Sequence, residues 1–234
     1  MSKVSFIVPT LDEAEGIQKV LNSLPEYELE EMGYEMEVLV IDGGSSDGTR
    51  RKVKETDVEL YIEDGGKASA VRRGLIECDG DYVFLIDGDG SYPCDKVPQM
   101  VERLENGSSM VLGSRLSGRV EEGAMTRTNK FGNRILTGLA NWLYGTQVSD
   151  LCTGLRGIKK KCVTDKVPGK DFEIEAGLHV LLSKEEISEV PISYKRRKGE
   201  SKLRVWDGFK IAKRLFVEKI KKKEKGFFRK VLQP

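Results

Sequence analysis

The sequence predicts an α/β fold, a single domain with a mostly parallel sheet flanked by helices. Short apolar runs alternate with segments whose apolar residues recur at helical spacing, which is the pattern of βαβ units. The run at residues 82–86 is continuously apolar, which suits a buried parallel strand and is too short for a typical helix. Acidic, glycine-rich segments follow several of these runs, and parallel sheets bind ligands beyond the carboxyl ends of their strands.

The composition limits the classes of protein to which the chain can belong. The chain has 234 residues and a net charge of +1, enough for one large domain and without the basic excess of a nucleic-acid-binding protein. The four cysteines are scattered and the chain has one histidine, so no zinc pattern fits and reduced thiols of a cytosolic protein are expected. The sequence shows neither a signal-peptide pattern nor an apolar stretch of roughly 18 residues, so we expect no membrane span.

The first half of the chain alternates strands and helices. Strands are expected at residues 4–8, 38–41, 58–62, 82–86 and 110–115, and helices at residues 17–24, 70–76 and 97–104. Gly65, Gly66 and Lys67 precede the second helix but lack the remaining residues of a phosphate-binding P-loop, so that motif is excluded. Lys67 at a helix N-terminus is still expected to attract phosphate.

The second half is less regular. Residues 116–128 are polar and glycine-rich and are expected to form a mobile loop, before a helix at residues 129–144. A turn into a short strand is expected at residues 150–158 and a helix at 172–182, with His179 packed in the core. Pro191 predicts that a last strand, at residues 187–194, lies at an edge of the sheet.

The C-terminal segment is basic and amphipathic. Residues 210–230 contain ten Lys or Arg and two Glu, and Phe209, Ala212, Phe216 and Ile220 share one helical face. We expect one domain to span residues 1–217, with residues 206–217 packed against the rest of it. Residues 218–234 are expected to form a basic amphipathic tail that either lies on an anionic membrane or is merely solvated.

Polar loops at three strand ends predict a binding site. Asp87, Gly88 and Asp89 follow the apolar run at 82–86, and Mg²⁺ binds through one or two carboxylates together with substrate phosphates. The alternative is a solvated turn, since Asp and Gly are common turn residues. Asp42 is expected to accept hydrogen bonds from a base or ribose, and Arg115 to neutralise phosphate charge.

Five motifs then occur in order, at residues 8–13, 41–49, 87–89, 113–115 and 199–202. Together they resemble family-two glycosyltransferases of the GT-A fold, whose sheet is Rossmann-like. Within that family the chain is most similar to the dolichol-phosphate mannosyltransferase branch and its polyprenyl-phosphate relatives. The resemblance extends from about residue 3 to residue 215. Two departures are notable: Gly43 stands where many relatives have a second Asp, and Ser91 stands where the mannosyl branch often has Gln.

The resemblance implies roles for individual residues. It implies a nucleotide-sugar pocket of Pro9, Glu13, Asp42, Lys67, Asp87, Gly88 and Asp89, in which Asp87 and Asp89 hold Mg²⁺ or Mn²⁺. It implies that Asp89, Arg115, Arg197 and Lys202 are catalytic. The implied acceptor-phosphate site comprises Arg115, Arg127, Arg134, Arg197, Ser201 and Lys202, and Asp150, Thr153 and Arg156 would shape the sugar or acceptor side.

The expected activity is inverting transfer of a sugar from a UDP- or GDP-sugar to a polyprenyl or dolichyl phosphate. The enzyme would be peripheral on the cytoplasmic face of a membrane, with its oligomeric state open. A lipid phosphate needs cations to position it but no catalytic base. A hydroxyl acceptor is the alternative, and Glu173 or Glu175 would then be the base, although a solvated helix face is the preferred interpretation of both. A non-catalytic peripheral membrane-binding protein is a further alternative.

Overall fold

The computed structural model describes residues 2–199, 202 and 204–231. In this part of the chain a seven-stranded sheet has the order β3-β2-β1-β4-β6-β5-β7. Its strands are β1 (Ser2–Thr10), β2 (Tyr34–Asp42), β3 (Glu59–Ile62), β4 (Tyr82–Leu85), β5 (Met110–Val120), β6 (Arg156–Lys159) and β7 (Ile187–Tyr194). Strand β6 runs antiparallel to both of its neighbours, and the other pairs are parallel. The predicted mostly parallel sheet is therefore confirmed.

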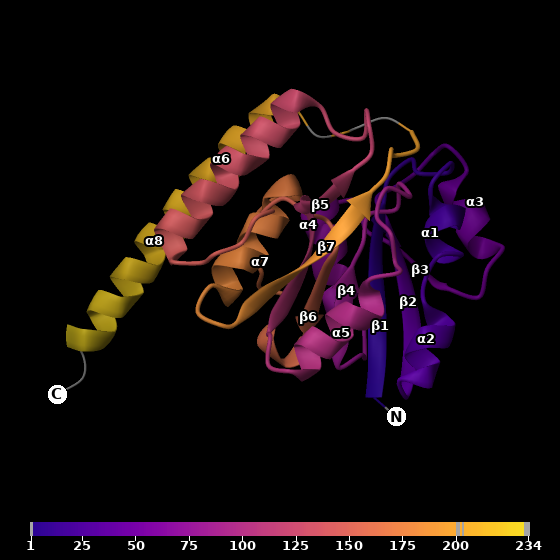
Figure 1. Ribbon diagram of the computed structural model, residues 1–234, viewed down its shortest axis with the longest axis horizontal. Helices are drawn as coiled ribbons and strands as arrows, with labels where there is room; N and C mark the ends of the chain where they lie inside the picture. The colour runs from indigo at the N-terminus through magenta and orange to yellow at the C-terminus, as the bar shows by residue number, and fades with distance from the viewer. Residues whose placement is uncertain (1, 200–201, 203, 232–234) are drawn as a thin grey trace.

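Helices cover both faces of the sheet (Figure 1). They are α1 (Ile17–Leu21), α2 (Glu26–Glu31), α3 (Thr49–Lys54), α4 (Lys67–Glu77), α5 (Val97–Glu105), α6 (Arg127–Tyr144), α7 (Ile174–Leu182) and α8 (Val205–Val231), with 3₁₀ turns η1 (Lys160–Cys162) and η2 (Asp171–Glu173). Buried side chains of α1, α2, α3 and α5 pack on one face of the sheet, and those of α4 and α7 on the other. The short helix α2 follows Pro25 in a segment for which no helix was predicted.

Alternation along the strands divides the core into two layers. Phe6 and Phe84 lie on the α1 and α5 side of the sheet, where their rings stack with centroids 5.5 Å apart. Ile7 and Leu85 point to the opposite side and pack with α4 and α7. Successive strand residues face opposite sides, so strands buried on both faces read as continuous apolar runs in the sequence.

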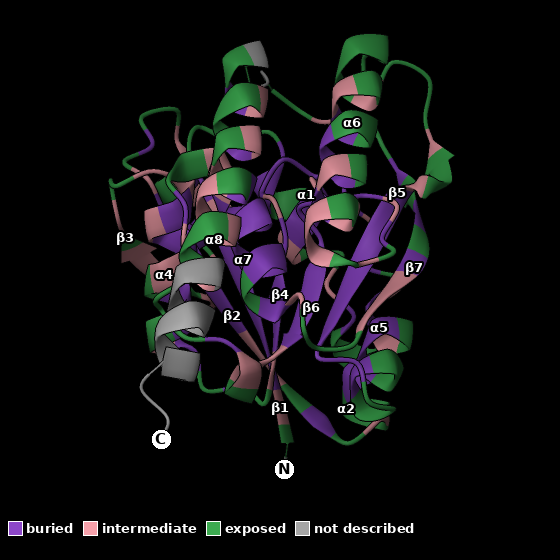
Figure 2. Ribbon diagram, turned by 90° about the vertical axis from the view of Figure 1, so that its left-hand side faces the viewer, coloured by how far each residue is buried: buried purple, intermediate pink, exposed green. Residues whose placement is uncertain are grey.

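A third apolar cluster joins α6, α7 and α8 outside the sheet layers. Helices α6 and α8 lie side by side and both begin near the carboxyl edge of the sheet (Figures 1 and 2). The side chains that bury α8 are Ile211 and Leu215, and the Tyr144 hydroxyl donates to the Leu215 carbonyl at 2.7 Å. Residues 206–217 therefore pack on the domain as predicted, but not through the face that Phe209 and Phe216 share, because both of these residues are exposed.

Other predictions for the second half have mixed outcomes. Strand β7 lies at the edge of the sheet and contains Pro191, as predicted, and His179 is a fully buried residue whose Nε2 lies 2.9 Å from the Thr146 hydroxyl. The loop expected at residues 116–128 is wrong in its first part. Strand β5 continues to Val120, because it pairs again with β7 beyond a register shift between Ser114 and Arg119.

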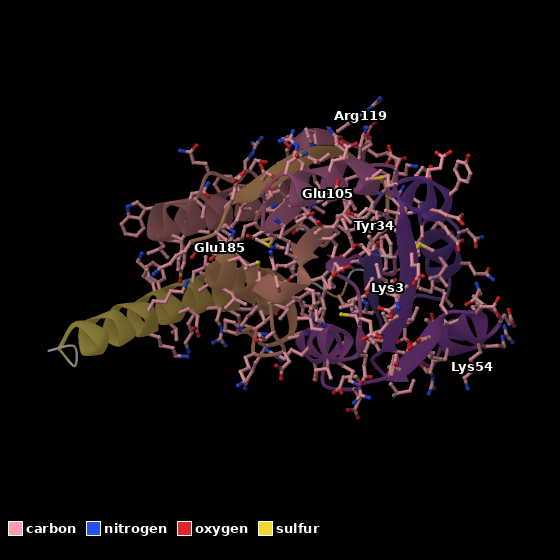
Figure 3. All side chains as sticks on the ribbon, turned by 90° about the horizontal axis from the view of Figure 1, so that it is seen from below. Lys3, Tyr34, Lys54, Glu105, Arg119 and Glu185 are labelled. Atoms are coloured by element: carbon pink, nitrogen blue, oxygen red, sulfur yellow. The ribbon has the colours of Figure 1, made fainter. Side chains whose placement is uncertain are left out.

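A hydrogen bond connects β2 to α5 at the amino edge of the sheet. The Tyr34 hydroxyl on β2 donates to a Glu105 carboxylate oxygen at the end of α5, over 2.5 Å, and both residues are labelled in the view from below (Figure 3). The polar loops named above lie at the opposite edge. Among the described helices, none combines the length and the low charge that crossing a bilayer requires.

Candidate active site at the carboxyl edge of the sheet

Two loops are joined where β1 and β2 end. The strands are in register up to Thr10 and Asp42, and the Gly43 amide then donates to the Thr10 carbonyl at 2.7 Å. Asp12 has a left-handed backbone (φ 48°), and its amide donates to the Ser45 hydroxyl at 2.8 Å. These contacts fix the direction of the chain between β1 and α1, and they position Glu13 at the edge of the sheet.

Asp42 holds its own loop together. Its Oδ1 accepts hydrogen bonds from the Gly44 and Ser45 amides at 3.1 and 2.8 Å, and its Oδ2 accepts from the Ser45 and Thr10 hydroxyls at 2.5 and 3.2 Å. The side chain is fully buried. Its placement suits shaping of the 42–49 loop, and direct contact of Asp42 with a base or ribose stays a prediction.

Asp87 and Asp89 follow β4, as the sequence predicts. Asp89 is 4% exposed, and its Oδ1 accepts hydrogen bonds from the Ser91 amide at 2.9 Å and the Ser91 hydroxyl at 2.5 Å. Burial and the neighbouring Asp87 charge raise the pKa of Asp89. Gly88 allows the segment between the two aspartates to pack closely on the end of β1, because a Cβ there would lie 2.7 Å from the Thr10 methyl group.

The basic segment after β7 returns to these carboxylates. The Lys195 and Lys198 amides donate to the Ser91 and Asp89 carbonyls at 2.9 and 3.0 Å. These bonds bring Arg197 Nη1 within 3.5 Å of Asp89 Oδ2, and Arg197 Nη2 within 3.0 Å of Glu13 Oε1. The predicted Arg197 therefore lies beside the carboxylates expected to bind the donor.

Glu13 is the centre of this charged cluster. Its Oε1 is 2.9 Å from Lys202 Nζ, in addition to its contact with Arg197, and Lys202 also donates to the Leu11 carbonyl. Burial raises the pKa of Glu13, and the hydrogen bond and charge of Lys202 oppose that shift only in part. Glu13 Oε2 is buried without a hydrogen-bond partner among the described residues.

Lys67 connects two carboxylates that are far apart in the sequence. Its Nζ lies 2.7 Å from Asp87 Oδ1 and 2.6 Å from Glu175 Oε1, at the start of α7. Burial raises the pKa of Asp87, but the charge and hydrogen bond of Lys67 more than offset this, so the pKa lies below its ordinary value. The interpretation of Glu175 as part of a solvated face is wrong, since the residue is buried.

A small cavity of about 10 Å³ adjoins this bridge. Its lining includes Pro9, Lys67, Asp87, Gly154 and Glu175. A Cβ at Gly154 would come within 2.4 Å of Asp87 Oδ2, so glycine is needed there for the carboxylate to keep its place. Pro9 and Lys67 thus line the same cavity as Asp87, and their contact with a sugar nucleotide stays a prediction.

Arg115 makes a bidentate ion pair at the end of the regular part of β5. Its Nε and Nη2 each lie 2.8 Å from a carboxylate oxygen of Asp150, and its guanidinium lies 5.2 Å from the ring centroid of Tyr194. Burial raises the pKa of Asp150, but hydrogen bonding and charge from Arg115 bring it below its ordinary value. The pair uses two of the five donors of Arg115. Contact of the others with a phosphate stays a prediction.

The remaining predicted residues lie elsewhere. Thr153 and Arg156 are fully buried, and Arg156 Nε donates to the Thr153 carbonyl at 3.0 Å, so both support the 150–156 segment from within. Arg127 and Arg134 lie on the exposed side of α6, and neither forms an ion pair with a site carboxylate in the part of the chain that the structure describes. Ser201 lies outside the described residues.

Two carboxylates of the site have the chemistry of ligands for a divalent metal. The described residues contain no group of three or more His, Cys, Asp or Glu side chains with metal-binding geometry. A magnesium site in a nucleotide-dependent enzyme needs only one or two carboxylates, because substrate phosphates and water complete the shell. Asp87 and Asp89 provide these two carboxylates, so the residues fit a metal that is held jointly with substrate phosphates.

The fold and the sheet edge define a class of protein. A sheet of this order with one antiparallel strand, covered by helices on both faces, is the GT-A architecture. A solved structure supports the assignment: glucosyl-3-phosphoglycerate synthase from Mycobacterium tuberculosis, crystallised with Mn²⁺, UDP and phosphoglyceric acid. The likeness has a TM-score of 0.69 and 18% sequence identity, and it covers 93% of this chain and 77% of that one. At this identity the likeness shows the fold alone.

Residues 5–165 match the family described as glycosyl transferase family 2, and the chain belongs to that family. Glycosyltransferase AglJ of Haloferax volcanii is 33% identical over 196 residues, covering 82% of this chain and 62% of the relative. The dolichol-phosphate mannosyltransferase of Pyrococcus furiosus is 27% identical over 212 residues, covering 86% and 59%. The chain thus spans about three-fifths of the length of each of these relatives.

Two side chains near the site, Tyr92 and Tyr194, were not assigned from the sequence, and Glu175 was considered there only as a base for a hydroxyl acceptor. Glu175 pairs with Lys67, and Tyr92 and Tyr194 pack edge to face beside Arg115, with centroids 5.0 Å apart. The Tyr92 hydroxyl also accepts a hydrogen bond from the Gly154 amide at 2.7 Å. The only signal was the proximity of Tyr92 to Asp89 in the chain, because the other two residues meet the site through tertiary packing.

Proposed function

We propose that this protein transfers a sugar, with inversion, from a UDP- or GDP-sugar to a polyprenyl or dolichyl phosphate. The observation that carries the proposal is one charged cluster at the carboxyl edge of the sheet. Glu13 and Asp89 there lie within 3.5 Å of Arg197, and Lys202 lies 2.9 Å from Glu13. A site that handles two phosphorylated substrates needs both carboxylates, for a metal, and cations, for phosphate.

The donor side of the proposed site lies over β1, β2 and β4. Asp87 and Asp89 would hold Mg²⁺ or Mn²⁺, and the bound ion would stabilise charge on the departing diphosphate. Lys67 keeps Asp87 ionised and oriented, since it is 2.7 Å away. Ser91 restrains Asp89 through two hydrogen bonds, so this carboxylate reaches the ligand in a fixed orientation.

The acceptor side is assigned to the cations of the basic segment, Arg197 and Lys202, with Arg115 behind them. An acceptor phosphate is already a nucleophile, so these residues need only position it against the repulsion of the donor diphosphate. A hydroxyl acceptor would need a general base. Glu175 is a poor base in this arrangement, because its Oε1 is held by Lys67 at 2.6 Å. This contact favours the phosphate acceptor.

The acceptor lipid would place the enzyme at a membrane. The curated relative from Pyrococcus furiosus is named for a dolichol-phosphate substrate, which supports a lipid phosphate for this chain. The C-terminal basic helix would contact the cytoplasmic face, where anionic lipids attract Lys and Arg.

Transfer of radiolabelled sugar into a lipid extract tests the proposal. Purified protein is incubated with UDP- or GDP-sugars, with polyprenyl phosphate, and with or without Mg²⁺ or Mn²⁺. We expect label in the lipid only with metal, and a loss of about 100-fold or more in Asp89→Asn. Asp57→Asn, at an exposed position on the same domain, is the matched control and should behave like the wild type. Undiminished turnover in Asp89→Asn would refute the site assignment.

A further inference from the structure

The outer surface of α6 and α8 is unusually apolar. On α6, Phe131, Ile135 and Trp142 are exposed and lie at spacings of four and seven residues, on one side of the helix. On α8, Trp206, Phe209, Phe216 and Ile220 are exposed at spacings of three, seven and four residues. We call these seven side chains the α6–α8 face. The two helices are adjacent and form the layer nearest the viewer in Figure 2.

Packing within the domain does not account for this face. Each helix has a second apolar stripe, formed by Leu136 and Ala140 on α6 and by Ile211 and Leu215 on α8, and these stripes are buried against α7 and each other. The α6–α8 face is therefore apolar surface that the packing of the described helices leaves exposed. Large exposed apolar patches of soluble proteins mark surfaces that bind a partner or a membrane.

The charges beside the face identify the kind of surface that it fits. Helix α6 has three basic residues and no acidic residue, and residues 205–222 of α8 have six basic and two acidic residues. Of the two acidic residues, Asp207 is buried and pairs with Lys210, and Glu218 pairs with Arg214 and Lys221. The two helices thus carry a net positive charge, even though Arg214 also pairs with Glu173, and a net positive charge matches an anionic surface.

Its aromatic content favours a bilayer over a protein. The chain has two tryptophans in all, and both belong to the face, with Trp142 76% exposed and Trp206 73% exposed. Tryptophan prefers the boundary between lipid headgroups and acyl chains, and lysine side chains can extend from that depth to the phosphates. An apolar stripe flanked by lysine on a helix is the pattern of helices that lie in the plane of this boundary.

We propose that the α6–α8 face lies in the interfacial layer of an anionic bilayer, with both helices parallel to the membrane. The proposal deepens the proposed function by naming the surface through which the enzyme would meet a lipid-borne acceptor. Both helices begin near the carboxyl edge of the sheet, so this orientation keeps the charged cluster beside the lipid headgroups (Figure 1). In this orientation α6 and residues 206–222 make the principal contact with the membrane. The sequence had suggested only the tail from residue 218 onward.

Vesicle binding by the full chain tests the proposal. Vesicles of phosphatidylcholine with phosphatidylglycerol are compared with vesicles of phosphatidylcholine alone, by flotation and by tryptophan emission. We expect binding to the anionic vesicles with a blue shift, and quenching by brominated lipid, since both tryptophans lie on the face. Phe131→Ser with Phe216→Ser keeps both reporters and should weaken partitioning about tenfold or more. Tyr27→Ser with Ile76→Ser replaces exposed apolar residues elsewhere and should bind as the wild type does.

The outcomes separate this proposal from the proposed function. Phe131→Ser with Phe216→Ser should keep normal transfer to a short, water-soluble polyprenyl phosphate, and Asp89→Asn should keep normal vesicle binding. If the wild type binds vesicles but transfers no sugar, the proposed sugar-transfer function is refuted and the proposed membrane contact of the α6–α8 face is supported. Equal vesicle binding by the serine variant and the wild type would overturn the membrane assignment. A dimer in light scattering that the serine substitutions dissociate would also overturn it, in favour of a second copy of the chain.

Discussion

Replacement of Lys67 by Met tests whether the bridge between Asp87 and Glu175 stabilises the domain. Methionine has a similar length and is easily packed, but it removes the charge that lies 2.7 Å from Asp87 Oδ1 and 2.6 Å from Glu175 Oε1. Two carboxylates then share one partly buried site without their cation. The variant therefore isolates the electrostatic contribution of the ammonium group.

The expected loss of stability can be estimated from the burial of the three side chains. Removing one partner of a buried ion pair costs about 3–5 kcal/mol in the free energy of unfolding. The side chains of Lys67 and Glu175 are 17% and 11% exposed, but that of Asp87 is 28% exposed, so water screens part of the interaction. We therefore expect Lys67→Met to lower the free energy of unfolding by about 3 kcal/mol, at the lower end of that range. For a domain of this size that loss lowers the Tm by roughly 6–12 °C.

The loss depends on pH in a defined direction. The folded-state pKa of Asp87 lies below its unfolded value, because of Lys67, so its stabilising contribution is present above the unfolded pKa and disappears as the pH falls through the folded pKa. In Lys67→Met this contribution is absent at every pH. The difference in stability between wild type and variant should be full near pH ~7 and should shrink on acidification toward pH ~3.

Urea unfolding followed by circular dichroism measures these differences. Lys67→Met with Glu175→Gln completes a double-mutant cycle, and the neutral amide should recover part of the loss, because it removes the repulsion between the carboxylates. A loss below about 1 kcal/mol in Lys67→Met would refute the reasoning. So would a difference from the wild type that does not change with pH.

Two further predictions concern packing and the buried ion pair. Gly177→Ala on α7 should lower the free energy of unfolding, measured with urea, by about 3 kcal/mol, since the new Cβ would lie 1.7 Å from the Pro168 carbonyl oxygen. Gly138→Ala on α6, with open space around it, should instead stabilise the protein by about 0.5–1 kcal/mol, and equal effects of the two variants would contradict the packing. Asp150→Asn should cost about 3–5 kcal/mol, because it leaves the Arg115 guanidinium buried without a counter-charge, and a variant as stable as Asp57→Asn would disprove this.

Local chemistry was enough to predict the sheet and the loops at its edge. The apolar run at residues 82–86 suits a strand buried on both faces, and this predicts that Asp87 and Asp89 follow it at the carboxyl edge. Pro191 lacks an amide donor, which restricts its strand to an edge, and β7 lies there. These inferences depend on neighbours in the chain, so the sequence contains the information that they require.

Tertiary pairing explains what the sequence did not predict. Glu175 has the sequence context of a solvated helix residue, and it is buried because Lys67, 108 residues earlier, lies opposite it. Helix α8 has two apolar stripes of similar strength, and only the position of α7 decides that Ile211 and Leu215 are buried while Phe209 and Phe216 face outward. Periodicity reveals that such a helix is amphipathic, but it cannot choose between two stripes.

The start of α7 links the outer helices to the charged site. Arg214 on α8 lies 2.7 Å from Glu173, and two residues further along the chain Glu175 holds Lys67, which in turn holds Asp87. Glu173 and Glu175 are separated by one residue at the junction of η2 and α7, so they cannot shift independently. A displacement of α8 at a membrane surface would therefore act on the same short segment that orients Asp87. The fold thus connects the proposed membrane contact and the proposed donor site through ion pairs on either side of one short segment, residues 173–175.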